Sequence, residues 1–165
     1  MTAMSASAAI GAPVERLLEA RRGTAYFSRI LNDTADDRLE REHNAAESVA
    51  RVALQARAMA EFLEAVRTAT SYRPRASLHD EEAVRFTATL SPTALRNLHA
   101  HAVVHLNVEW RDLPAALWSI GAGGWSEDLR TPETLVDERR AQVWLSALAL
   151  DPLGRTAALP RDLLE

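Results

Sequence analysis

The stretch Ser91–Pro114, SPTALRNLHAHAVVHLNVEWRDLP, has the pattern of a long amphipathic helix and decides the fold class. Ser91 suits the N-cap, where its hydroxyl can accept a backbone N–H, and Pro92 suits the first turn. Apolar residues recur along one face at helical spacing: Leu95, Leu98, Ala102, Leu106 and Leu113. The stretch therefore predicts a helix that buries one side against partners.

Three further segments have the same periodicity. We expect helices over Val14–Leu31, over Asn44–Thr68 and from Thr131-Pro132 to Leu150, with a short helix over Leu78–Thr89. Strand signals are almost absent, so the pattern predicts an all-α fold, a four-helix bundle. We expect residues 1–13 to form a disordered tail and residues 14–165 to form a single helical-bundle domain. Four tryptophans are expected to be core or loop anchors: Trp110, Trp118, Trp125 and Trp144.

Composition excludes several classes of protein. The chain has 165 residues, a net charge of −4 and no basic block, which argues against nucleic-acid binding. It has no cysteine, and all 19 basic residues are arginine, so a thiolate nucleophile and a lysine Schiff base are excluded. No signal-peptide pattern or membrane-length apolar run is present, so we expect a cytoplasmic protein with no membrane role.

The predicted helix over Ser91–Pro114 carries the first candidate site. His101, His105 and Glu109 follow one another at i, i+4 and i+8, so adjacent pairs could share a proton or a metal. All three cannot hold one ion, because i to i+8 spans about 12 Å along a helix. In the structural alternative, His99 and His105 are partly buried and hydrogen-bonded, and Glu109 pairs with an arginine.

Two further candidates lie on other predicted helices. Arg51 is close to the apolar positions of the second helix and needs an anion or carboxylate partner, unless it extends to the bundle edge. Gln142 and Ser146 lie four residues apart on one face of the last helix, with Arg139 beside them. They bind a ligand there, or they form a hydrogen-bonded pair that only sets the helix register.

Three stretches together resemble the N-terminal domain of the mycothiol-dependent maleylpyruvate isomerase family, whose bundles are DinB-like. They are LLEARRGTAYFSRILN (Leu17–Asn32), LRNLHAHAVVHLNVEWRDLP (Leu95–Pro114) and RRAQVWLSALAL (Arg139–Leu150). The resemblance covers most of Leu17–Leu150 and is weakest from His43 to Thr70. It implies a DinB-like four-helix bundle.

The resemblance also implies a metal that activates the sulfur of mycothiol. The family's usual ligands are a histidine on the second long helix and a Glu-x-x-x-His pair on the fourth. On this chain those positions fall at Arg51, Gln142 and Ser146. A permanent cation, a neutral amide and a hydroxyl make a poor ligand set, so we expect no metal and no other cofactor. The family's smaller C-terminal domain is expected to be absent.

These considerations predict a metal-independent small-molecule enzyme, an isomerase, cyclase or lyase of specialised metabolism, that uses the emptied metal pocket. The expected catalytic residues are His105, Glu109 and Arg51. The expected substrate-binding residues are Gln142, Ser146, Arg139 and His101. The substrate would be anionic or carbonyl-containing. The alternatives are a non-catalytic ligand-binding or partner subunit, and a metal enzyme that uses His101 with His105; the oligomeric state, including a homodimer, stays open.

Overall fold

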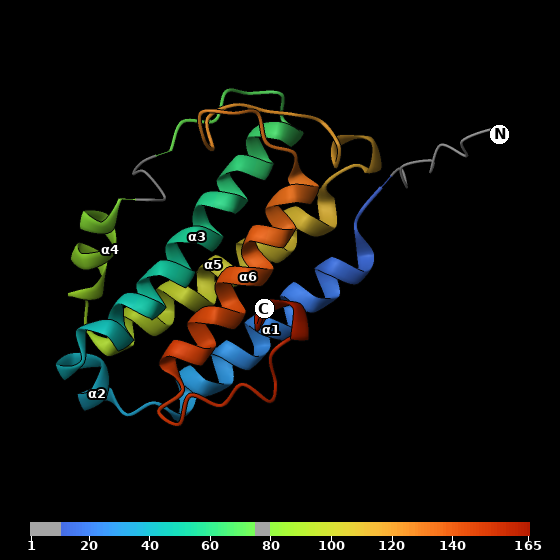
Figure 1. Cartoon of the computed structure of the whole chain (residues 1–165). Coiled ribbons are helices and arrows are strands. Elements are labelled where there is room, and N and C mark those ends of the chain that lie inside the picture. The colour runs from blue at the N-terminus through green and yellow to red at the C-terminus, as the bar shows by residue number, and fades with distance from the viewer. Residues whose placement is uncertain (1–10, 75–79) are drawn as a thin grey trace.

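The computed structural model describes residues 11–74 and 80–165, and helices make up most of this part (Figure 1). The helices are α1 (Val14–Asp33), α2 (Asp36–Arg41), α3 (His43–Arg67), α4 (Glu81–Ala88), α5 (Pro92–Asp112) and α6 (Pro132–Leu150). Two single 3₁₀ turns, Ala115–Leu117 and Arg161–Leu163, follow α5 and α6. The only β pairing among the described residues is one isolated bridge, Ala122 with Arg130. The all-α prediction is confirmed.

The four long helices lie side by side and form the bundle (Figure 1). Helix α6 packs against α1 and α3, and α3 packs against α5. Helices α1 and α6 run parallel. Arg16 pairs with Asp137, and three residues later on both helices Glu19 pairs with Arg140. Helix α6 is antiparallel to α3, because the first turns of α6 pack on the last turns of α3.

Small side chains on α3 bring the helices close together. Alanines occupy most of the buried face of α3: Ala45, Ala46, Ala50, Ala53, Ala56, Ala60 and Ala65. Larger apolar residues of the other three long helices fill the space beside this face, among them Phe27, Leu95, Leu106 and Leu135. This packing leaves little room in the core, so a polar group buried there must find its partner from a neighbouring helix.

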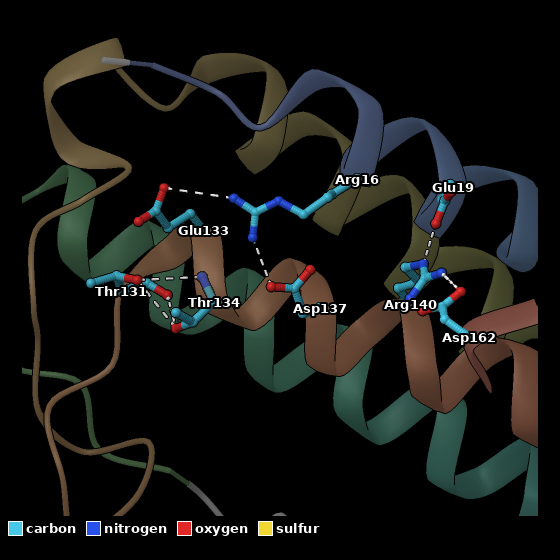
Figure 2. Close-up of polar contacts among 8 residues, drawn as sticks. All are labelled: Arg16, Glu19, Thr131, Glu133, Thr134, Asp137, Arg140 and Asp162. Carbon is cyan, nitrogen blue, oxygen red and sulfur yellow. Dashed lines mark hydrogen bonds and ion pairs between the residues drawn. The ribbon is translucent and has the colours of Figure 1, made fainter. Parts of the chain in front are cut away.

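The predicted caps are present at two helix starts. The Ser91 hydroxyl accepts the backbone N–H of Ala94 at 3.2 Å, and Pro92 is the first residue of α5. In α6 the Thr131 hydroxyl accepts the backbone N–H of Thr134 at 3.3 Å, which Figure 2 shows. These bonds satisfy N–H groups that lack a partner inside the helix, and so they set where each helix begins.

Ion pairs join α1, α6 and the C-terminal segment on one face of the bundle (Figure 2). Arg16 donates to Asp137 at 2.7 Å. Arg140 lies between Glu19 and Asp162 and donates to both oxygens of Asp162, at 2.8 and 2.6 Å. Pairs of this kind contribute little each at the surface, but Arg140 links three segments of the chain.

The sequence predicted the ends of all four long helices to within two residues. It missed α2, a six-residue helix whose only buried residue is Leu39, so it has almost no periodicity to detect. The start of the expected helix at Leu78 lies outside the described residues. All four tryptophans are buried, as expected. Within the described residues, none of the helices combines the length and the apolarity needed to span a bilayer.

Replacing Gly23 by alanine tests how close α1 and α6 are. The added Cβ would lie 2.7 Å from both Val143 Cγ2 and Trp144 Nε1, so one of the helices must move. We expect Gly23→Ala to lower the free energy of unfolding by about 1–3 kcal/mol, measured by urea denaturation. Gly121→Ala is the control, because its Cβ would meet nothing nearer than 3.5 Å. Equal stability of the two variants would contradict this packing.

Candidate functional site

Polar side chains from all four long helices lie in the middle of the bundle. Ser28 comes from α1, Gln55 from α3, His99 from α5 and Arg139 from α6, and we call these four residues the polar centre. Ser28 bonds to His99, and Arg139 bonds to Gln55. Sites of four-helix bundles are commonly built in this way, from facing side chains in the core.

Arg139 is fully buried. Its Nη1 donates to the backbone oxygen of Val52 at 2.7 Å and to Gln55 Oε1 at 3.3 Å. Its Nε and Nη2 are buried and have no hydrogen-bond partner, and no carboxylate of the described residues forms an ion pair with it. Burial lowers the pKa of Arg139 to about 9, which still leaves the guanidinium charged at pH 7. A positive charge thus lies in the core beside neutral groups only.

His99 is the second buried titratable group of the polar centre. Its Nε2 shares a hydrogen bond with the Ser28 hydroxyl at 2.8 Å, and its Nδ1 is buried without a partner. Burial, and then the charge of Arg139, lower the pKa of His99 to about 4. The imidazole is therefore neutral at pH 7, with one nitrogen that can still donate or accept.

Gln142 and Ser146 continue the polar face of α6 beyond Arg139. The Gln142 amide donates to the Ser146 hydroxyl at 2.7 Å, and Ser146 is buried. The two residues that interrupt the apolar pattern are thus each other's partner, as the structural alternative predicted. Their role in substrate binding stays a prediction.

Arg51 is bound to a carboxylate. Its Nη1 and Nη2 donate to the two oxygens of Glu81, at the start of α4, at 2.6 and 2.9 Å. This pair lowers the pKa of Glu81 below its usual value. Among the described residues no hydrogen bond joins Arg51 with Gln142 or Ser146, so the three predicted positions are not connected by direct contacts.

The remaining predicted residues lie where α5 faces α3. Glu109 is buried and accepts from Arg67 Nε and Nη2 at 3.1 and 3.2 Å, which confirms the expected pairing with an arginine. His105 is partly exposed, with its Nε2 3.9 Å from Glu109. His101 is exposed and lines a groove of about 230 Å³ together with His105. Among the described residues, no hydrogen bond or ion pair joins this group to the polar centre.

One group on this face has ligand atoms close enough for a metal ion. A carboxylate oxygen of Glu64, a ring nitrogen of His105 and an oxygen of Glu109 all lie within 4.8 Å of one another. Arg67 occupies both oxygens of Glu109, however, and a divalent ion would have to displace that cation. The arrangement favours the ion pair over a metal.

The comparisons with known proteins agree with this architecture. No family model matches the sequence, and no curated protein does. Two solved structures match: the mycothiol-dependent maleylpyruvate isomerase, with a TM-score of 0.80 and 28% identity, and a histidine-to-alanine mutant of it, with a TM-score of 0.81 and 27% identity. Each match covers 92% of this chain and 65% of the isomerase chain. Over this length the chain is similar to mycothiol-dependent maleylpyruvate isomerase in fold and, more weakly, in sequence.

The family implies a metal, and the residues at the positions assigned to its ligands do not fit one. Arg51 is a permanent cation held by Glu81. The Gln142 amide nitrogen is a donor directed at Ser146, so neither side chain presents an anionic or imidazole ligand. These side chains therefore give no basis for a metal-dependent step.

Sequence reasoning missed part of the polar centre. Ser28 and Gln55 are polar residues on mostly apolar or Ala-rich helix faces, and although Gln55 lies four residues after Arg51, nothing in the sequence marks it as a partner of Arg139. His99 was recognised only as a buried histidine. Each of the four long helices carries one polar residue of this group part-way along its length. This pattern identifies a site only when the order of the helices around the bundle is known.

The lowered pKa of His99 predicts a pH-dependent stability. In the unfolded chain this imidazole has a pKa near 6.5, so between pH 6.5 and 4 the unfolded state binds the proton and the folded state does not. The contribution of His99 to the free energy of unfolding is therefore fully present above pH 6.5 and is lost as the pH drops towards 4. Between pH 7 and 5 we expect the free energy of unfolding to fall by about 2 kcal/mol. Urea denaturation at both pH values measures this loss.

The control for this measurement is the exposed histidine two residues further on. His101→Gln should keep the pH-dependent loss, and His99→Gln should lack it. A loss of the same size in both variants would show that His99 does not titrate as its burial requires.

Proposed function

We propose that this chain is an isomerase-type small-molecule enzyme, acting as an isomerase, cyclase or lyase, that works without the metal of its family. Its substrate carries a carbonyl and a negative charge. The observation that supports this most directly is that a buried, charged Arg139 and a neutral His99 both lie in the core and each keep buried donor atoms without a partner. Specialised metabolism and a cytoplasmic location remain part of the proposal.

The polar centre has the two groups that a proton-transfer reaction next to a carbonyl needs. With Ser28 donating to Nε2, a neutral imidazole can accept a proton at Nε2 through the Ser28 hydroxyl, which takes the substrate proton as it gives up its own. A guanidinium in a dry core stabilises the negative oxygen that forms as the proton leaves, because little solvent screens it. Gln142 and Ser146, one and two turns along α6, would orient the rest of the substrate.

The other predicted residues take supporting roles in this proposal. Arg51 and Glu109 each carry a bidentate ion pair, so acting on a substrate would first require breaking it. His105 and His101 are accessible from the α3–α5 groove, where they could deliver or accept protons from water. The proposal therefore gives these four residues supporting roles and assigns the chemistry to His99 and Arg139.

The alternative is a non-catalytic bundle that binds a ligand or a partner subunit. The pairs Arg51–Glu81 and Arg67–Glu109 favour it, because they neutralise charges that an active site would use. In this alternative His99 and Arg139 bind the ligand but transfer no proton.

A proton-exchange assay separates the two. We expect the purified protein in D₂O to exchange the protons next to the carbonyl of maleylpyruvate or of other small 2-oxo acids, followed by NMR, both with and without mycothiol. A chelator should leave the rate unchanged. His99→Gln should reduce it by about 10²–10⁴-fold, the usual contribution of a general base, whereas His101→Gln should not. Exchange at the buffer rate with every acid would support the non-catalytic alternative.

Rebuilding the family's ligands tests the assignment of their positions. The triple variant Arg51→His, Gln142→Glu, Ser146→His should bind one zinc ion per chain, measured by metal analysis after dialysis, while the wild type holds less than one. The control replaces the same three residues by alanine and should bind none. One tightly held ion in the wild type would contradict metal independence, and none in the triple variant would contradict the assigned positions.

A further inference from the structure

Three arginines of this chain hold a carboxylate with the Nε/Nη2 edge of the guanidinium, whereas Arg51 and Arg140 use Nη1 and Nη2. Arg67 uses Nε and Nη2 on Glu109, Arg111 uses them on Asp112, and Arg155 uses them on Asp151. This edge matches the two oxygens of a carboxylate in spacing and direction. An Nε/Nη2 edge without a partner is therefore one of the two places where an arginine of this chain could bind a carboxylate.

In Arg139 the protein contacts only Nη1, outside the Nε/Nη2 edge. Nη1 makes both contacts, with Val52 and Gln55, and Nε and Nη2 have no partner although they are fully buried. A buried donor without a partner costs about 1–3 kcal/mol, more when it is charged. The side chain is thus held at one end with its carboxylate-binding edge directed at no protein acceptor.

His99 adds a donor of the same kind. With Ser28 donating to Nε2, the imidazole carries its proton on Nδ1, which has no partner and is buried. The charge of Arg139 acts on this ring, so the two groups lie within electrostatic reach of each other. The polar centre thus has three N–H groups to offer and no anion among the described residues to accept them.

We propose that the Nε/Nη2 edge of Arg139, together with His99 Nδ1, binds one carboxylate group of the ligand. The inference rests on the proposed function in one respect: it takes the polar centre as the ligand site. It goes further by naming the group recognised and the atoms that recognise it. A carboxylate supplies the missing negative charge and accepts from all three donors at once, which satisfies the buried groups together.

Gln55 is the side chain that admits the ligand. It is partly exposed, and its two contacts, 3.3 Å from Arg139 and 3.5 Å to the backbone oxygen of Glu138, are long. Moving it therefore loses little hydrogen-bond energy. The proposal requires this movement of Gln55 to let the ligand reach the buried edge of Arg139.

Formate and acetate are the probes for this subsite, with chloride at matched ionic strength as the reference. At tenfold excess over its Kd, formate should raise the Tm of the wild type by about 3–6 °C, and the rise should saturate. Arg139→Met should lose this response and fold at least as stably in chloride, because an unpaired buried charge has been removed. Arg140→Met, at the neighbouring surface position, should keep the response.

Direct observation in the wild type covers the case in which a variant fails to fold. In ¹⁵N-labelled protein, formate should shift the Arg139 Nε–H signal and fix the His99 proton on Nδ1, while His101 stays unchanged. Equal formate responses of wild type and Arg139→Met, or unshifted Arg139 and His99 signals at saturation, would overturn the inference.

The two proposals fail separately. If formate acts through Arg139 but no 2-oxo acid undergoes exchange, the carboxylate subsite stands and the enzymatic function falls. If exchange is catalysed and depends on His99 while Arg139→Met keeps the formate response, the function stands and the subsite is wrong.

Discussion

The burial of the Arg139 charge is the constraint on which the middle of the bundle depends. The guanidinium cannot lose its proton at neutral pH, and its contact with the Val52 carbonyl ties α6 to α3. The same charge, added to burial, keeps His99 neutral. One residue therefore sets the position of two helices and the protonation state of the histidine on a third.

The polar pair on α6 shows how two side chains at the spacing of helix-borne ligands can instead satisfy each other. Gln142 and Ser146 keep the i, i+4 spacing that two ligands on one helix face require, but here the amide of one donates to the hydroxyl of the other. Arg51, at the position assigned to the third ligand, is bound by Glu81. The bundle folds around these contacts with the same topology as the solved isomerases, at a TM-score of 0.80.

Much of the fold could be predicted because the dominant signals are local. The caps at Ser91 and Thr131 and the apolar stripe of each helix depend only on residues three or four positions apart. The candidate site was harder to predict. Helical wheels placed Arg139 on an inward face and Glu109 near the apolar stripe, but no wheel shows which side chain lies opposite.

The sequence by itself determined the all-α class, the four long helices, their starting points and the resemblance to an isomerase family, since periodicity and capping are properties of short segments. Only the tertiary structure decided which polar residues meet. Ser28 and His99 are 71 residues apart, and Arg139 and Gln55 are 84 apart. Their contacts follow from the order of the helices around the bundle and from the height of each residue along its helix. Those two quantities depend on how the Ala-rich face of α3 packs against its neighbours.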